Sequence, residues 1–237
     1  MKSVSFFFIS LFVSINTLAA QEQTGLSGTD TRFERSGKIN YPTTNWNPLI
    51  GVSQININNT DDPAPILDNF ICDAILERAE TDFSFINKGD ITSGLYAGEI
   101  TMLDLYALCP LDRTLVVLEV DGAFLMALVE KCLSGYRKGL AVGGAKIEYS
   151  AQRPSGNRLT YFQIGNYPAY PKKEYRVVTT DYLADGHAGF DLLTGVDSSK
   201  VFKTNIPLRE ALKQYIQRHT PLGPASVMTE ARCIRKP

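Results

Sequence analysis

The most informative stretch of this chain is Phe83-Ser84-Phe85-Ile86-Asn87-Lys88-Gly89-Asp90-Ile91-Thr92. Its first five residues are mostly apolar and fit a short buried strand, and Gly89 then predicts a turn. A glycine turn that directly follows a strand exposes backbone N–H groups, which is the usual geometry for holding an anionic ligand. The segment therefore predicts a strand, a loop and a candidate ligand site within one short stretch.

The sequence around this segment predicts a mixture of helices and strands. Residues 65–76, before the strand, place apolar side chains on one helical face, and Pro65 stands at the start, where proline is tolerated. The other predicted elements are helices after the N-cap Thr101, over 123–133 and over 207–219, strands over 114–120 and 175–180, and a hairpin joining 146–150 to 159–164. Because the order lacks strict β-α-β alternation, it favours an α+β fold with a mixed β-sheet and flanking helices.

The N-terminal part of the chain divides into two predicted segments. Residues 1–20 have the features of an export signal, because Lys2 gives a short positive end and small residues follow a mostly apolar run. Residues 21–60 are rich in Gly, Ser, Thr and Asn, which indicates a flexible arm or linker with one edge strand near 53–57. Residues 61–237 are then expected to form one domain of a secreted or periplasmic protein.

Composition argues against two classes of partner. The apolar run within residues 1–20 is shorter than the roughly 20 residues that span a bilayer, and no later segment is apolar over that length. Removing Lys2 from the 24 basic residues leaves them just outnumbered by the 25 acidic residues. This balance gives no electrostatic reason to expect nucleic acid or an anionic membrane as a partner.

Four cysteines follow the predicted cleavage site: Cys72, Cys109, Cys132 and Cys233. Export to an oxidising compartment permits disulfides, with three possible pairings. The cysteines form no C-x-x-C unit, which argues against a zinc site. Cys72 and Cys132 lie in helical patterns among apolar neighbours. Disulfide formation and burial as small hydrophobic side chains therefore stay open as alternatives.

Several motifs resemble the C-terminal domain of 5′-nucleotidases and UDP-sugar hydrolases, in the same order along the chain. The helix Leu67-Asp68-Asn69-Phe70-Ile71-Cys72-Asp73-Ala74 is similar to the Leu-Gly-Asn-Leu-x-x-Asp-Ala helix of that family, and residues 87–92 are similar to its Asn-x-Gly-Gly-Ile-Arg loop. Three short segments also resemble family motifs: 97–101 resembles Gly-x-Ile-Thr, 108–111 resembles Leu-Pro-Phe-Gly-Asn, and 120–122 resembles Leu-x-Gly. Two longer segments follow: 139–144 resembles Phe-Leu-Gln-Val-Ser/Gly-Gly, and 182–190 resembles Phe-Leu-Ala-x-Gly-Gly-Asp-Gly-Tyr/Phe. The resemblance runs from about residue 64 to 220 and implies the α+β fold of this domain.

The resemblance also implies a ligand cleft that is built from distant parts of the chain. Its candidate residues are Asn87, Gly89, Asp90, Thr92, Arg113, Tyr182, Gly186, His187, Gly189 and Phe190. Tyr182 matches one of the two aromatic residues that sandwich a nucleobase in the family, whereas Gly139 stands in place of the other. Thr92 replaces an arginine that engages the polar end of the substrate, and Ala188 replaces an aspartate that holds ribose hydroxyls. One hydrogen bond to a charged group is worth about 1.5–3 kcal/mol, so these losses predict weak nucleotide binding. Arg113 is a candidate for partial replacement.

Each of these residues also has a structural interpretation. Asn87 can satisfy the loop backbone, and Tyr182 can be a core residue. Gly186 and Gly189 can serve as turn glycines whatever binds nearby. His187 can be an incidental loop histidine without an acid–base role.

In the family that this chain resembles, catalysis depends on a separate N-terminal domain that holds two metal ions. Such a site needs several His ligands, and the chain has two histidines, His187 and His219. The sequence has neither a Gly-x-Ser-x-Gly elbow nor a P-loop. We therefore expect no catalytic residue, no metal and no cofactor in this chain.

The leading hypothesis is a secreted, non-catalytic ligand-recognition or accessory module. Its expected partners are a nucleotide or nucleoside-like small molecule and a separate metallophosphatase subunit. One alternative is the substrate-binding half of a split 5′-nucleotidase, whose metallophosphatase chain would hydrolyse the nucleotide. Another is a structural or partner-binding protein with a filled pocket.

Overall fold

The computed structural model describes residues 47–58, 65–134, 139–224, 226–227 and 230–237. All of them belong to the unit Thr44–Pro237. The predicted export signal (1–20) lies outside the described residues, as does most of the predicted arm (21–60). The domain boundaries after residues 20 and 60 therefore stay predictions.

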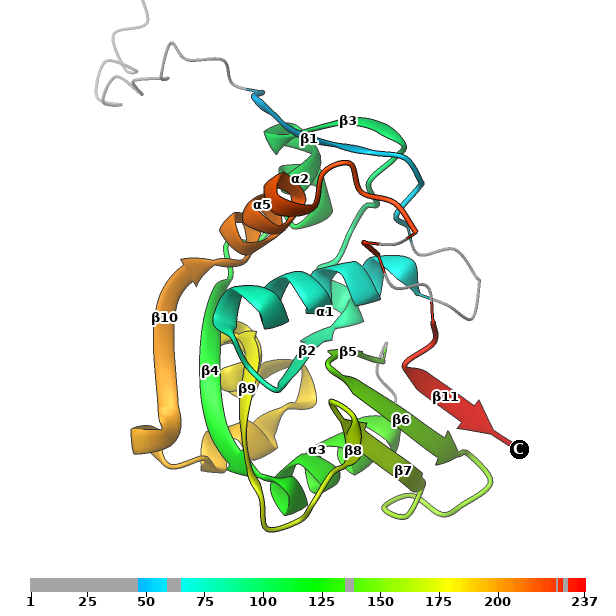
Figure 1. The fold of residues 1–237 in the computed structure, drawn as a ribbon. Coiled ribbons are helices and arrows are strands. Elements are labelled where there is room, and N and C mark those ends of the chain that lie inside the picture. The colour runs from blue at the N-terminus through cyan, green and yellow to red at the C-terminus, as the bar shows by residue number, and fades with distance from the viewer. Residues whose placement is uncertain (1–46, 59–64, 135–138, 225, 228–229) are drawn as a thin grey trace, which may run out of the picture. The chain divides into compact units, whose positions relative to one another are not determined.

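A five-stranded mixed sheet forms the centre of the fold (Figure 1). Its strands, in spatial order, are β10 (Val201–Pro207), β4 (Thr114–Asp121), β9 (Glu174–Thr180), β2 (Phe83–Asn87) and β5 (Leu140–Gly143). β2 runs parallel to β9, whereas the other neighbouring pairs are antiparallel. The mixed sheet of an α+β fold is thereby confirmed, and β2 occupies the strand predicted from the opening segment.

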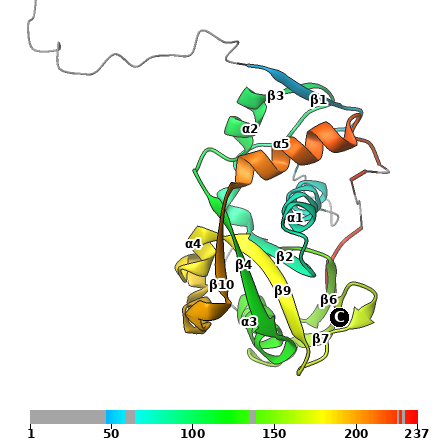
Figure 2. The same cartoon turned by 60° about the vertical axis from the view of Figure 1, so that its left-hand side comes forward.

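Helices cover both faces of this sheet. The helices are α1 (Ile66–Ala79), α2 (Met102–Leu108), α3 (Gly122–Ser134), α4 (Asp181–Ala184) and α5 (Leu208–His219). Side chains alternate along β4, so that Leu115 and Val117 pack in the cluster with α1 and α5, whereas Val116 and Leu118 pack with α3. Figure 2 shows α1 and α4 on opposite sides of β4 and β9. Because both faces of the sheet are covered, β4 is buried over consecutive residues, which explains its nearly continuous apolar sequence.

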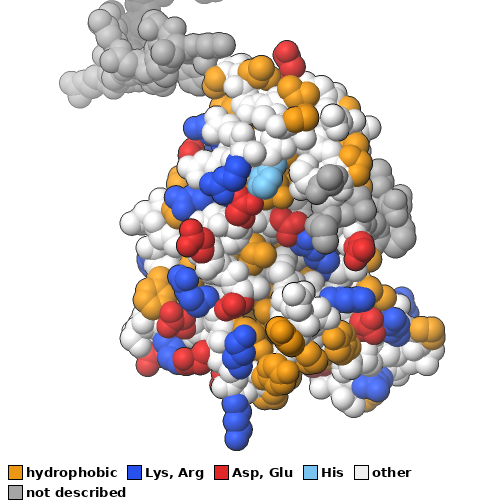
Figure 3. Space-filling view, viewed as in Figure 1, with side chains coloured by type: hydrophobic (Ala, Val, Ile, Leu, Met, Phe, Trp, Pro, Cys, Tyr) orange, Lys and Arg blue, Asp and Glu red, His pale blue; other side chains and the backbone are white. Residues whose placement is uncertain are grey.

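A second, four-stranded sheet continues from the central one. Its order is β11 (Cys233–Lys236), β6 (Ala145–Ser150), β7 (Leu159–Ile164) and β8 (Tyr167–Pro168). Gly144 joins β5 to β6 with φ +69°, and a Cβ there would lie 2.5 Å from the Asp82 carbonyl oxygen. The bend between the two sheets therefore requires glycine. Figure 3 shows hydrophobic side chains gathered over β6 and β8, a region in which Tyr161, Tyr167 and Tyr170 are exposed.

The remaining strands form a short antiparallel pair, β1 (Leu49–Ser53) with β3 (Gly98–Thr101). The edge strand predicted near 53–57 is thus found a few residues earlier, and Ile57 is instead a buried residue in an isolated bridge to Leu95. Thr101 precedes α2 as predicted, and its backbone N–H and hydroxyl both donate to Asp104 Oδ2, at 2.7 and 2.6 Å. Four short 3₁₀ turns complete the described elements: Lys88–Asp90, His187–Gly189, Asp191–Gly195 and Ser198–Lys200.

Candidate functional site

A pocket of about 200 Å³ lies where helix α3 and the loop after α4 face the ends of β2 and β5. Its lining residues come from four parts of the chain: Asn87, Lys131, Cys132, Gly139, Ala188, Gly189, Phe190 and Asp191. Lys131 Nζ and Asp191 Oδ1 form an ion pair at 2.5 Å, and the Asn87 amide supplies both a donor and an acceptor. The pocket therefore presents groups of both charges and an amide to a small molecule.

The loop 186–190 owes its shape to residues with positive φ. Gly186 has φ +85°, and a Cβ there would lie 2.6 Å from Thr194 Cγ2, so glycine is required. Gly189 has φ +87°, and Ala188 between them has φ +52°, which is unusual for a residue with a Cβ. The loop places Ala188, Gly189 and Phe190 at the pocket, while the Phe190 ring stacks on Phe85 with centroids 5.5 Å apart.

Arg113 and Tyr182 lie just beyond the paired ends of β4 and β9. The last pair of these antiparallel strands is Leu115 with Thr180, so the start of β4 and the start of α4 lie at the same edge of the sheet. The Thr114 hydroxyl donates to Asp181 Oδ2 at 2.8 Å across this edge. Arg113 Cζ lies 4.0 Å from the centroid of the Tyr182 ring, within the range of a cation–π contact.

The Tyr182 ring has a second planar neighbour. The His187 ring stacks on it with centroids 4.6 Å apart and an interplanar angle of 17°. One face of a phenol ring accommodates one planar group at these distances, so we infer that Arg113 and His187 cover opposite faces. We call these three residues the Tyr182 stack. The stack leaves neither face of the ring available to a ligand.

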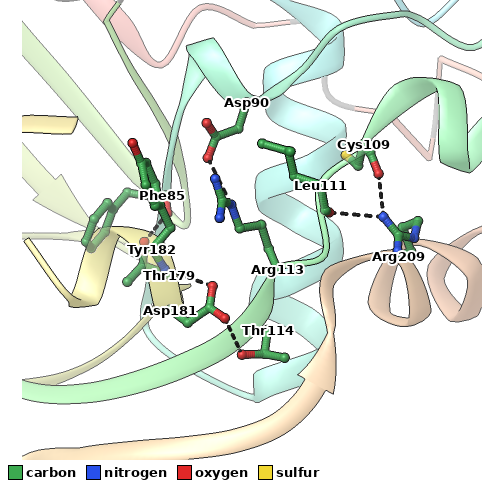
Figure 4. Close-up of polar contacts among 10 residues, drawn as sticks. All are labelled: Phe85, Asp90, Cys109, Leu111, Arg113, Thr114, Thr179, Asp181, Tyr182 and Arg209. Atoms are coloured by element: carbon green, nitrogen blue, oxygen red, sulfur yellow. Dashed lines mark hydrogen bonds and ion pairs between the residues drawn. The ribbon is translucent and has the colours of Figure 1, made fainter. Parts of the chain in front are cut away.

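Asp90 joins the Tyr182 stack from the loop after β2 (Figure 4). Its Oδ2 lies 3.8 Å from Arg113 Nε, and each side chain is 19% exposed. Burial raises the pKa of Asp90 above its usual 3.8, and the Arg113 guanidinium offsets part of that effect. Arg113 Nε is buried and makes no hydrogen bond within the described residues. Asp90 therefore acts as a partly buried counter-ion that leaves Arg113 incompletely satisfied.

Thr92 is directed at helix α2. Its hydroxyl donates to the Ala107 carbonyl at 2.7 Å, and its backbone N–H donates to the Leu108 carbonyl at 3.1 Å. These bonds fasten the end of the glycine loop to the last turn of α2. Gly89 lies in the 3₁₀ turn Lys88–Asp90 and is not among the residues with positive φ.

The ten predicted ligand residues thus fall into separate groups. Asn87, Gly189 and Phe190 line the pocket. Asp90, Arg113, Tyr182 and His187 form the Tyr182 stack and its counter-ion. Gly89, Thr92 and Gly186 have local structural contacts or turn positions. Their roles in binding a ligand stay predictions.

Sequence reasoning missed two ion pairs at this site. Lys131 and Asp191 carry no motif, and their pairing depends on how α3 meets the loop after α4. Lys88 Nζ lies 2.6 Å from Oδ2 of the buried Asp68, and a Cβ on Gly139 would lie 3.5 Å from Lys88 Cδ. The Lys88 stem therefore runs beside the position where the family has a ring. A carboxylate on the apolar face of α1 was the sequence signal for this pair.

All four cysteines, each within the described residues, are present as thiols. Burial raises the pKa of Cys72 well above its usual value, that of Cys109 to about 12 and that of Cys233 to about 11. Cys72 and Cys109 are buried, as the burial alternative expects, whereas Cys132 and Cys233 are half-buried. The described ranges contain no group of three or more His, Cys, Asp or Glu that could hold a metal ion. In the same part of the chain, no helix combines the length and apolar character needed to cross a membrane.

Comparison with known families and sequences gives a consistent result. The model of the family described as 5′-nucleotidase, C-terminal domain, matches residues 44–195. The chain is 28% identical to Protein UshA of Yersinia enterocolitica over 165 residues, covering 69% of this chain and 29% of that protein. It is 28% identical to the snake venom 5′-nucleotidase of Gloydius brevicauda, covering 67% of this chain and 31% of that protein. The chain therefore spans less than a third of the length of these relatives.

Solved structures share the fold. The 5′-nucleotidase precursor from Thermus thermophilus superposes with a TM-score of 0.70 at 24% identity, covering 80% of this chain and 40% of that one. The NAD nucleotidase of Haemophilus influenzae gives the same TM-score at 17% identity, covering 80% of this chain and 38% of that one. At these identities the likeness establishes the fold and leaves the ligand open.

Proposed function

The chain belongs to the 5′-nucleotidase C-terminal domain family, and from that premise we propose that it is a non-catalytic module that recognises a small ligand. The observation that carries the proposal is the open pocket at the end of β2. Asn87, Gly189 and Phe190 line it, at the positions where the family resemblance places a ligand. Lys131 and Asp191 add charged groups that can orient a polar molecule.

The non-catalytic part of the proposal rests on composition. Two-metal hydrolysis requires several His and carboxylate ligands around the ions, and the whole chain has two histidines. His187 stacks on Tyr182, and His219 Nε2 lies 2.7 Å from Glu77 Oε2. Each histidine thus has a structural contact that accounts for its position, and the two lie on different elements.

A second candidate is the substrate-binding half of a split 5′-nucleotidase. It fits the matched family model, which describes the C-terminal domain of 5′-nucleotidases. A metallophosphatase on a separate chain would then supply the hydrolysis. The structural alternative, a protein with a filled pocket, fits the covered Tyr182 ring, but the open pocket lined by Asn87, Gly189 and Phe190 counts against it.

Export is part of the proposal. The predicted signal at residues 1–20 would direct the protein to the periplasm or the medium, and one relative is named as a venom protein. N-terminal sequencing of the protein produced in its own cells tests this directly. A start at Gln21 agrees with cleavage, and an intact Met1 in the cytoplasmic fraction contradicts it.

A thermal-shift screen tests ligand recognition. The purified protein would be heated with nucleosides, nucleotides and monosaccharides. A ligand at a hundred times its Kd stabilises the folded state by about 2.7 kcal/mol, which raises the Tm of a domain this size by several degrees. Asn87→Ala and Lys131→Ala should reduce the shift, while Asn157→Ala, in an exposed turn, should leave it unchanged. The absence of any shift, or a shift that persists in both pocket variants, would contradict recognition at this site.

A further inference from the structure

The Tyr182 stack contains one anchored partner and one exposed partner. Arg113 directly precedes β4 and faces Asp90 at 3.8 Å, and its side chain is 19% exposed. His187 is exposed and lies in the loop of residues with positive φ. The His187 imidazole stacks on the Tyr182 ring. His187 is therefore the partner that decides whether the outer face of the ring is open.

The stacking geometry of His187 is that of a planar ligand ring. A nearly parallel ring at 4.6 Å occupies the favourable offset-stacked position for an aromatic group on Tyr182. A planar ligand could use this face only if the imidazole left it. The cost of displacing His187 would reduce the affinity for every planar ring in the same way.

The pocket, whose lining includes Ala188, the residue after His187, favours a different kind of molecule. Its volume of about 200 Å³ is below the range of about 300–1,000 Å³ that is typical of sites for drug-sized ligands. An anionic ligand would meet the Asp191 carboxylate, and a cationic ligand would meet the Lys131 ammonium, because the two groups lie 2.5 Å apart. A neutral polyhydroxy molecule avoids both conflicts, since hydroxyl groups donate to a carboxylate and accept from an ammonium or an amide.

We propose that His187 closes the outer stacking face of Tyr182 to planar rings, and that the pocket, whose lining includes the next residue, Ala188, takes a neutral monosaccharide-sized ligand. The ligand class rests on the proposed function, because it assumes that the pocket binds a small molecule. The role of His187 rests only on the geometry of the Tyr182 stack. The two parts can therefore fail separately.

Adenosine serves as the planar probe in NMR titrations of the wild type and of His187→Ala. A base stacked on an aromatic side chain contributes about 1–3 kcal/mol, which at 1.4 kcal/mol per tenfold is a gain of about 5- to 140-fold in affinity. We expect that gain in His187→Ala, with upfield shifts of the adenosine ring protons. Adding Tyr182→Leu to His187→Ala should abolish the gain. His219→Ala is the matched control, because His219 packs on Tyr215, with centroids 4.2 Å apart, on helix α5.

Methyl glycosides of the common hexoses serve as probes of the pocket. At least one should bind the wild type, and Asn87→Ala should lose that binding, whereas His187→Ala should retain it.

If His187→Ala gains no adenosine affinity, or if the wild type binds adenosine equally well, the role of His187 is wrong. If no glycoside binds the wild type, or if charged analogues bind more tightly, the ligand class is wrong. A gain for adenosine in His187→Ala, together with a wild type that binds nothing in the thermal screen, would refute the proposed function and leave the role of His187 standing.

Discussion

Ala188 has a backbone conformation that is unfavourable for a residue with a Cβ. Its φ of +52° lies in the left-handed region, which costs an L-residue with a Cβ about 1–2 kcal/mol. Glycine avoids this cost but loses about 0.4–1 kcal/mol through the freedom of the unfolded chain. We expect Ala188→Gly to raise the free energy of unfolding by about 0.5–1 kcal/mol. Urea denaturation measures this change.

Ala127 provides the matched control for Ala188. It is exposed within helix α3, where Ala→Gly should lower the free energy of unfolding by about 1 kcal/mol. Opposite signs for the two substitutions would locate the strain in the loop. A loss of stability in both would show that Ala188 fits its conformation without strain.

Asp90 makes the stability of the folded state depend on pH. Burial raises its pKa above 3.8, so the folded state holds the proton more tightly than the unfolded state does. The carboxyl group therefore contributes stability below about pH 4, and that contribution is lost as the pH rises through the raised pKa. Asp90→Asn removes the titration, so the variant should gain stability relative to the wild type as the pH rises from about 3 to 7.

Urea unfolding at several pH values tests the Asp90 prediction. Asp185→Asn, which removes an exposed carboxylate, controls for the loss of a surface charge. If Asp90→Asn instead becomes less stable relative to the wild type as the pH rises, the attraction of the Arg113 guanidinium outweighs the burial of the carboxylate. The Tyr182 stack would then depend on Asp90 for its position.

At the scale of elements, Thr92 connects the glycine loop to helix α2. Its hydroxyl bond to the Ala107 carbonyl is 2.7 Å long, and a hydrogen bond of this kind contributes about 0.5–1.5 kcal/mol. Thr92→Val keeps the shape of the side chain and removes the donor, so the free energy of unfolding should fall by about that amount. The ligand shifts in the thermal screen should stay unchanged relative to the variant's own Tm. Thr160→Val, at an exposed strand position, is the control. A variant with wild-type stability but weaker ligand binding would make Thr92 a ligand residue.

Elements with a clear apolar run or a one-sided apolar pattern could be predicted, and contacts between distant elements could not. The apolar run at 83–87 is β2, and the one-sided pattern of 207–219 is α5. The edge strand was misplaced because residues 49–53 gain their structure from pairing with β3, which no local pattern reveals. The contact between Arg113 and Tyr182 depends on the pairing of β4 with β9, which brings the residues just beyond the two strand ends together. Pairing between strands so far apart in sequence has no local signal.

At the scale of the whole molecule, motifs identified the family, while the chemistry of the site required the structure. Asn87 and Gly189 kept their family residue types, and both line the pocket. Lys131 and Asp191 lie 60 residues apart and belong to no motif, so their ion pair emerges only when α3 and the loop come together. The stack of His187 on Tyr182 was missed because a histidine in a glycine loop gives no sign of where its ring will lie.

The chain on its own should not hydrolyse phosphate esters. Hydrolysis of a phosphate ester by this family's route needs two metal ions held by several side chains, and the 237 residues contain two histidines. We expect the purified chain, supplied with Mn²⁺, Zn²⁺ or Co²⁺, to release no phosphate from AMP and to cleave no UDP-glucose above background. A full-length 5′-nucleotidase assayed in parallel controls for substrate and metal. Adding a metallophosphatase chain from the same cells separates the two candidate functions, because a split enzyme should gain activity that Asn87→Ala then reduces. Turnover by the chain alone that co-elutes with the protein and persists after metal-free purification would contradict both candidates, since it would require a hydrolytic site that neither contains.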